Sequence, residues 1–530
     1  MVEGDEKPAL QVIILGCGGG PKEDNTTAFL VRSTSSAWRR GSLLAVDAGV
    51  HLAAISKIIE PAIVEALATS KSMPITLSTG PFAGLQLPNK CPSANAAYVT
   101  RTLVETYLIT HPHLDHISGF VVNTASLNGS RPKRLAGLPS TIEAFKLHIF
   151  NNVIWPNLSD ENNGAGLVSY MRLVEGGSPY LGDDEGRGFV EVCDGLSVKT
   201  WSVSHGHCVE RHEHRGSSAE FRPRGSHDLS HHIDSSPLGP MRAGSNAASQ
   251  MYHRQGISPE RYQQERICVY DSSAYFIRDI NTGREVLIFG DVEPDCISLS
   301  PRNLRVWSEA APKIASGLLR GIFIECSYDD SQADKVLFGH LAPRHLVAEL
   351  KVLARCVEEV RESEQNDDKG DDRIDGSGKK RKRFSNGIEL ETPGSGLRRS
   401  GRTSSGMHTS SLVEGRPNAA RADSSGLSPR TRPQLLSGME VAQFDEEPLV
   451  DHPATSTRSM LASGEPDEER FFGTTTPLQG LKVIVIHVKD KLVDGKTVGE
   501  SILEELLEYE EDLGLGCEFV ISEIGMSVFL

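Results

Sequence analysis

The segment THPHLDHISGF at residues 110–120 places four potential metal ligands within six positions, directly after an apolar run. His111 and His113 lie two residues apart and can close on one cation, whereas Asp115 and His116 can face a second one. Imidazole and carboxylate donors without a thiolate are the set expected for zinc or a similar first-row cation. The alternative is a solvated, histidine-rich turn without ligands. The spacing, and the position at the end of a strand-like run, favour a metal site.

A metal site that keeps room for water needs further protein ligands, and these should follow other strands. Three polar residues stand at the ends of apolar runs, each followed by a loop: His205, Asp291 and His487. Any one of them alone would more often be an ordinary loop residue. Together with the H-x-H-x-D-H segment, they are predicted to complete the site. Asp47, which ends another apolar run, could support the metal loop or simply form a turn.

The sequence patterns around these residues predict an α/β domain that positions them. Short apolar runs rich in Val, Ile and Leu are typical of sheet strands covered by helices. Such runs lie at 10–16, 27–33, 42–49, 104–110, 196–206, 267–279, 284–291, 321–328 and 481–490. Apolar spacings of three and four residues predict amphipathic helices. These lie at 51–63, 140–150, 341–360 and 500–514. Residues 517–530 are predicted to be one terminal strand, in the sheet that the first strand begins.

Two long segments interrupt this pattern. Residues 209–262 and 361–475 are rich in Ser, Gly, Arg and Pro and poor in aliphatic residues. Such segments cannot bury enough apolar surface to offset the entropy of ordering, so we expect both to be disordered insertions. Residues 10–208 and 263–360 are then the first and second parts of one domain, which 476–530 complete with a strand, a helix and a strand.

Composition excludes some classes of function. The formal charge of -16 argues against a general nucleic-acid binder, which needs a surplus of Lys and Arg on one face. The nine cysteines form no C-x-x-C pair and are expected to be reduced thiols. No stretch approaches the roughly 20 apolar residues of a membrane span, so we expect no membrane association and a cytoplasmic location. The run KKRKRF at 379–384 could be a nuclear signal or a charged run that keeps an insertion solvated.

Several motifs together resemble one known family. HPHLDHISGF, the N-terminal LGCGGGPKEDNTTAFLV, LPSTIEAFKLHIFNNVIWPNL, WSVSHG and GHLAPRHLVAEL are similar to the class II cyclic-nucleotide phosphodiesterases, the family of the fungal low-affinity cyclic-AMP enzyme. The family belongs to the metallo-β-lactamase superfamily. The resemblance therefore implies an αββα sandwich, with the two insertions as departures from the family pattern.

The resemblance also implies a ligand set and an activity. His111, His113 and His205 are expected to hold one metal ion, Asp115, His116 and His487 a second, and Asp291 to bridge the two. Zinc is the expected metal for both sites, with manganese or magnesium as alternatives. The implied reaction is hydrolysis of 3′,5′-cyclic AMP, and of cyclic GMP as well or instead, to 5′-monophosphates by a hydroxide that the metals share. Loss of Asp115 is expected to abolish turnover.

Further residues are predicted around that centre. By similarity to the tRNA-processing members of the superfamily, His340 is expected to be a proton-donating acid rather than a ligand, and Glu325 could orient its imidazole. His148, Asn151 and Trp155 are candidates for the substrate pocket, with core packing as the alternative.

Smaller features complete the expected site. The start of a helix at Ser118 and Gly119 could present a positive dipole end. The glycine-rich run 16–20 lacks the Lys of a phosphate-binding loop and is expected to be a tight turn that brings backbone close to the site.

Two other functions stay open at this stage. An enzyme of the same fold could cut a different phosphodiester, such as a tRNA 3′ trailer, and would then need a basic arm for RNA. Alternatively, the chain could be a non-catalytic scaffold whose insertions recruit kinases or other regulatory partners. The expected partner is a small cyclic nucleotide rather than a nucleic acid, and the sequence does not decide whether the protein forms a homodimer.

Overall fold

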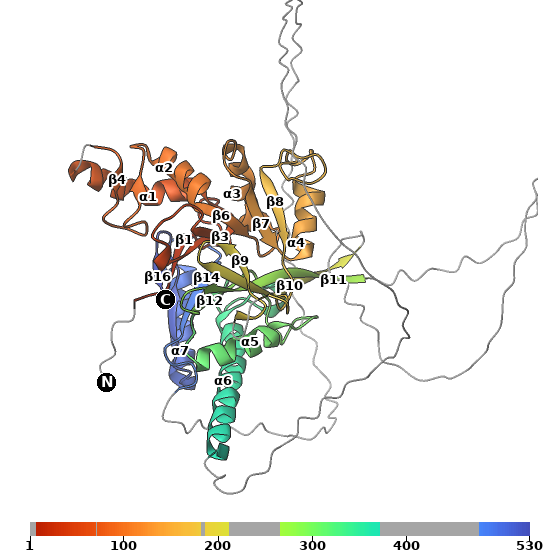
Figure 1. The fold of residues 1–530 in the computed structure, drawn as a ribbon. Helices are drawn as coiled ribbons and strands as arrows, with labels where there is room; N and C mark the ends of the chain where they lie inside the picture. Colours follow the sequence, from red (N-terminus) through yellow and green to blue (C-terminus); the bar gives the residue numbers. More distant parts are fainter. Residues whose placement is uncertain (1–6, 70–71, 182–185, 211–265, 372–475) are drawn as a thin grey trace, which may run out of the picture. The chain divides into compact units, whose positions relative to one another are not determined.

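The computed structural model describes residues 7–69, 72–181, 186–210, 266–371 and 476–530 (Figure 1). All of them belong to one compact unit, residues 1–375 together with 472–530. Most of the two expected insertions, including the basic run at 379–384, lies outside the described residues. Within these ranges, no helix combines the length and the apolar composition that crossing a bilayer requires.

Two mixed sheets of seven strands form the centre of this unit (Figure 1). The first has the order β16-β1-β2-β3-β6-β7-β8, antiparallel from β16 to β3 and parallel from β3 to β8. Its strands are β1 (Leu10–Gly16), β2 (Ala28–Ser33), β3 (Leu43–Ala48), β6 (Val104–Leu108), β7 (Lys133–Gly137), β8 (Val168–Arg172) and β16 (Ser527–Phe529).

The second sheet has the order β15-β14-β13-β12-β11-β10-β9. It is parallel from β12 to β15 and antiparallel from β9 to β12. Its strands are β9 (Val190–Cys193), β10 (Leu196–Glu210), β11 (Arg266–Asp279), β12 (Glu285–Phe289), β13 (Leu319–Glu325), β14 (Lys482–Ile486) and β15 (Glu518–Ile521). A small separate ladder pairs β4 (Ile75–Thr76) with β5 (Gln86–Leu87).

Helices cover the outer face of each sheet, as Figure 1 shows. On the first sheet lie α1 (Leu52–Thr69), α2 (Pro92–Tyr98), α3 (Leu114–Asn123) and α4 (Pro139–Ala144). On the second lie α5 (Asn303–Ala315), α6 (Pro343–Asp371) and α7 (Val498–Leu513). Short helical turns are η1 (Thr34–Ser36), η2 (Val99–Leu103), η3 (Thr124–Ser126), η4 (Phe145–Ile149) and η6 (Asp334–Val336).

Alternation along the strands explains this layering. In β1, Ile13 and Leu15 face the helices, whereas Val12 and Ile14 belong to the core between the two sheets. Because successive side chains of a strand point to opposite faces, a fully apolar strand must be covered on both. The result is a four-layer helix–sheet–sheet–helix sandwich, which is the αββα architecture expected from the sequence.

Several predicted elements need correction. Residues 517–530 form two strands rather than one: β15 pairs with β14 in the second sheet, and β16 pairs with β1 in the first. The chain turns between them at Gly525, whose φ of +83° suits glycine. The predicted pairing of the last residues with the first strand is therefore present only for β16.

Helix boundaries also differ from those expected. The helix predicted to begin near Ser118 begins at Leu114, so Ser118 and Gly119 lie in its second turn and present no helix end. Strand β10 continues to Glu210 and α6 to Asp371, which takes ordered structure into both expected insertions. The division of the domain by its insertions otherwise stays a prediction.

Candidate metal centre

The seven predicted ligands meet at one edge of the sandwich, where the parallel strands of both sheets end. His111 and His113 follow β6, and the first turn of α3 presents Asp115 and His116. In the second sheet, Asp291 follows β12 and His487 follows β14. His205 lies inside β10, at a bulge between Ser204 and His207. Because a bulge re-aims side chains, it turns this imidazole towards the same edge.

A first group of donors surrounds one side of Asp291. Its Oδ2 atom lies 3.6 Å from Nε2 of His111 and 3.4 Å from Nε2 of His205. His113 completes the group, whose four donor atoms all lie within 4.8 Å of one another. Three imidazoles and one carboxylate at this separation can hold a divalent cation without rearrangement of the backbone.

A second group surrounds the same carboxylate from the other side. Nε2 of His116 lies 3.1 Å from Oδ1 of Asp291, and Nε2 of His487 lies 3.3 Å from Oδ2. Oδ2 of Asp115 is 3.7 Å from Nε2 of His487, so these four donors also lie within 4.8 Å of one another. Asp291 is thus common to both groups, which is the geometry of a carboxylate that could bridge two ions.

The unpaired state of the ring nitrogens fits a metal site. Nε2 of His111, His116 and His487 is buried and has no hydrogen-bond partner among the described residues. Buried polar atoms are nearly always paired, so three such atoms around Asp291 fit the role of donors to a cation. Burial lowers the pKa of His205 to about 3, and those of His111 and His487 well below the usual 6.5. Neutral imidazoles keep the lone pair that a cation requires.

The opposite nitrogen of each of three imidazoles is held by a neighbouring group. Asp47 accepts from Nδ1 of His116 at 2.8 Å, and the hydroxyl of Thr27 lies 2.8 Å from Nδ1 of His487. The carbonyl of Gly339 accepts from Nδ1 of His205 at 2.9 Å. These contacts set the orientation of the rings, because a bond at Nδ1 leaves Nε2 facing the centre. The sequence points to Asp47 but gives no signal for Thr27.

We predict that Asp47→Asn weakens metal binding by roughly 10- to 100-fold, the usual effect of losing a partner behind a metal-ligating imidazole. Asp47 also accepts from the backbone and hydroxyl of Thr110, both at 2.8 Å, and an amide cannot serve all three donors. Titration of metal-free protein with zinc measures the change. Asp279→Asn is the matched control, since Asp279 is equally buried but belongs to neither donor group. Equal affinities in both variants would contradict the prediction.

The glycine-rich turn comes as close to the centre as the sequence suggests. A Cβ atom added to Gly19 would lie 2.5 Å from Nε2 of His487, so any larger residue would displace that ring. The carbonyl of Gly19 accepts from Nζ of Lys489 at 3.1 Å, which brings an ammonium group to the edge of the centre.

His340 and Glu325 form a buried pair beside the two donor groups. Nδ1 of His340 lies 3.0 Å from both carboxylate oxygens of Glu325, and 3.9 Å from Oδ2 of Asp291. Glu325 also accepts from the backbone of Val292 and the hydroxyl of Ser327, so its position is fixed. Burial opposes protonation of His340, but the charge and hydrogen bond of Glu325 and the charge of Asp291 together raise its pKa above the usual 6.5. The pair could equally offer two further donors to a cation.

The three predicted substrate residues fall in different places. His148 is exposed and lines a cavity of about 250 Å³ together with His111 and His113. Asn151 instead caps a local turn, where its side-chain oxygen accepts from the backbone of residues 153 and 154. Trp155 packs against the core under the first sheet and donates a hydrogen bond to Thr124. Core packing is the alternative to a place in the substrate pocket.

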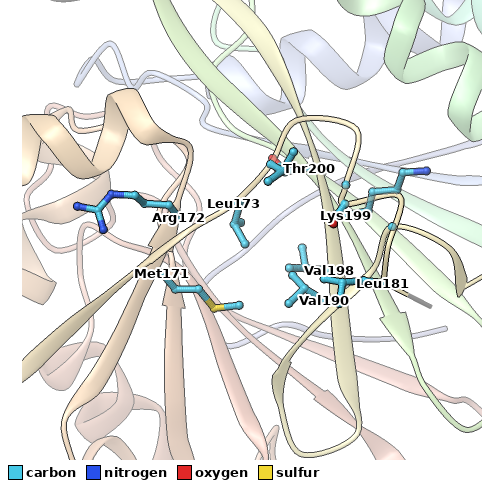
Figure 2. Close-up of a pocket in the computed structure, with 12 residues that line it drawn as sticks. Met171, Arg172, Leu173, Leu181, Val190, Val198, Lys199 and Thr200 are labelled. Carbon is cyan, nitrogen blue, oxygen red and sulfur yellow. The ribbon is translucent and has the colours of Figure 1, made fainter. Parts of the chain in front are cut away.

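A separate cavity lies far from this chemistry, between the free edges of the two sheets (Figure 2). It measures about 70 Å³, and Met171, Leu173 and Val198 point into it. The charged ends of Arg172 and Lys199 point away, towards carboxylates of Glu161 and Glu309. None of the candidate ligands lines it, so it is a small apolar gap between the layers.

Comparison with known proteins identifies the family. A family model described as class-II cAMP phosphodiesterases matches residues 42–366, more than half of the chain. The chain belongs to this family. Among similar proteins, the 3′,5′-cyclic-nucleotide phosphodiesterase of Schizosaccharomyces pombe is 28% identical over 346 residues, which cover 65% of this chain and 75% of that one. The Candida albicans protein of the same name is 26% identical over 385 residues, covering 65% and 82%.

A solved structure supports the fold assignment. The crystal structure of unliganded yeast PDE1 matches with a TM-score of 0.53 and 19% sequence identity, over 99% of this chain and 100% of that one. At that identity the likeness bears on the fold alone. With the four-layer sandwich described above, it shows the metallo-β-lactamase fold that the sequence predicts.

Proposed function

We propose that this protein hydrolyses 3′,5′-cyclic nucleotides to 5′-monophosphates at a centre of two divalent metal ions. The observation that carries the proposal is the pair of four-donor groups that share Asp291. One ion would be held by His111, His113 and His205, and the other by Asp115, His116 and His487. Membership of the class-II family, with relatives named for this activity, supports the choice of substrate.

Zinc is the ion that we propose for both positions, because the donors are imidazoles and carboxylates without a thiolate. Bound there, divalent ions would neutralise charge on the phosphodiester and lower the pKa of a water molecule towards neutrality. Because Asp291 belongs to both donor groups, it would fix the separation between them. Five of the seven donors are buried, all except His113 and Asp115, which strengthens the electrostatic interactions around them.

His340 would supply the proton for the departing 3′ oxygen. Because its Nδ1 atom is held by Glu325, Nε2 is the atom that can donate. The raised pKa favours the protonated imidazole, the form that a general acid requires. Glu325 is then a positioning residue, which fixes the ring and stabilises its charged form.

Removal of the metal is the direct test of this function. We expect protein treated with a chelator to lose hydrolysis of cyclic AMP and cyclic GMP, and to regain it when zinc or manganese is added back. Metal content measured on the same samples should approach two ions per chain in the active form. A linear diester such as bis-p-nitrophenyl phosphate serves as the comparison substrate.

Two results would count against the proposal. Full turnover by metal-free protein would remove the metal-dependent mechanism. A metal-loaded protein that cleaves the linear diester but neither cyclic nucleotide would keep the centre and reject the substrate class.

A further inference from the structure

A second and larger cavity opens beside the metal centre, and His148 does not line it. Its volume is about 600 Å³. His113 and His205 form part of its wall, so it is continuous with the first donor group. Asp334, Lys335, Leu337, Phe338 and Gly339, which precede α6, also line it. A molecule bound through a phosphate at the donor groups could therefore extend into this space.

Apolar side chains line the mouth of this cavity although water reaches them. Tyr270 is 39% exposed, Ile297 38% and Phe338 71%. Burial of such side chains stabilises a fold, so leaving three exposed around one cavity forgoes stabilisation that packing could supply. Apolar groups gathered at a polar site are typical of ligand pockets, where they bind the uncharged part of the ligand.

The backbone at Phe338 adds an independent observation. Its φ is +54°, in the left-handed region that bulky residues rarely adopt. The next residue, Gly339, has φ +82°, and a Cβ atom there would lie 2.7 Å from the backbone nitrogen of Gly206. Its carbonyl also holds the ring of His205. The loop is thus fixed against β10, and Phe338 is held in a strained conformation with its ring in water.

Strain at an exposed aromatic residue is not explained by folding, because the ring packs against little in this position. Strained residues of this kind persist where function requires their geometry. We infer that Phe338 is the surface on which the nucleobase of the substrate stacks, with Tyr270 on another wall of the same cavity. This inference rests on the proposed function and specifies where the base lies. The smaller cavity at Leu147 and His148 is the competing location.

The test distinguishes the effect of the Phe338 ring on substrate binding from the effect of its backbone conformation. Phe338→Asn keeps a residue that tolerates the left-handed region but removes the ring, whereas Phe338→Tyr keeps the ring. We expect Phe338→Asn to raise KM for cyclic AMP by roughly tenfold or more, the usual effect of losing one base–aromatic stack. Phe338→Tyr should behave like the unmodified protein. For 1-deoxyribose 3′,5′-cyclic phosphate, which has no base, all three proteins should give the same kcat/KM.

Controls distinguish this inference from the proposed function. Leu147→Ala and His148→Ala probe the smaller cavity, and Tyr180→Ala removes an aromatic side chain that is 94% exposed and lines neither cavity. Calorimetric binding of AMP and of ribose 5-phosphate to the metal-loaded proteins reports on stacking without turnover. Should Phe338→Asn unfold, Phe338→Leu provides the ring-free variant.

Three outcomes are informative. Weaker AMP binding by Phe338→Asn, with ribose 5-phosphate unaffected, supports stacking even if no cyclic nucleotide is hydrolysed. Normal cyclic AMP turnover with an unchanged KM in Phe338→Asn overturns the inference and leaves the proposed function intact. An increased KM in Leu147→Ala or His148→Ala instead places the base in the smaller cavity and also overturns it.

Discussion

Asp291→Asn is expected to remove both metal ions and to lower hydrolysis of cyclic nucleotides by at least roughly a thousandfold, since metal ions supply several kcal/mol of transition-state stabilisation. The reason is that this carboxylate lies within 3.6 Å of Nε2 of four imidazoles, two in each donor group. An amide keeps the shape of the side chain but loses the negative charge that offsets two cations. Metal analysis and turnover should be measured on the same preparation.

The matched control is Asp295→Asn, four residues further along the same loop. Asp295 accepts from the backbone of Arg302 and Asn303 at the start of α5, a role that Asn can also fill. This variant should keep metal and activity. If Asp291→Asn retained two ions per chain and near-normal turnover, Asp291 would not bridge the sites and the proposed centre would have to be abandoned.

A second large effect is expected for His340→Gln. Loss of a general acid typically lowers rates by about 10²–10⁴-fold, and we expect a decrease in this range for cyclic AMP. Bis-p-nitrophenyl phosphate should be affected far less, because nitrophenolate leaves without a proton. Metal content should not change. Comparing kcat for the two substrates therefore tests the role of His340 as an acid directly.

Other roles of His340 predict different results. If the variant loses a metal ion, His340 is a ligand within the third donor group, which it forms with His205, Asp291 and Glu325. If both substrates slow equally while metal is kept, the ring only supports the site. His345→Gln is the control, because His345 is also buried at the start of α6 but contacts Asp334 rather than the centre.

Most of the strands could be predicted from the sequence because they are buried on both faces. The run 10–16, for example, consists mostly of apolar residues, and that pattern is typical of central strands in a layered α/β fold. The candidate ligands could be predicted for a related reason. A polar residue at the end of such a run marks the edge of the sheet, where parallel strands from both layers end together.

Other features depend on contacts that no local pattern contains. Residues 517–530 have the pattern of one continuous strand, yet they form two strands, one in each sheet. This division depends on pairing with β14 and β1, which the local sequence does not contain. An aromatic residue such as Trp155 suits a purine pocket or a core equally well, and its contact with the core is visible only in the structure. The hydroxyl of Thr27 reaches His487 across 460 positions of sequence, so its part in the site is visible only in three dimensions.

The candidate ligands belong to both layers of the sandwich. His111 and His116 follow a strand of the first sheet, whereas His205, Asp291 and His487 belong to the second. A cation held among them would cross-link the sheets, and its binding free energy would add to the free energy of unfolding, since the unfolded chain has no assembled site. Metal affinity and closure of the sandwich are then coupled equilibria. A substitution that loosens packing between the sheets should weaken metal binding without altering any ligand.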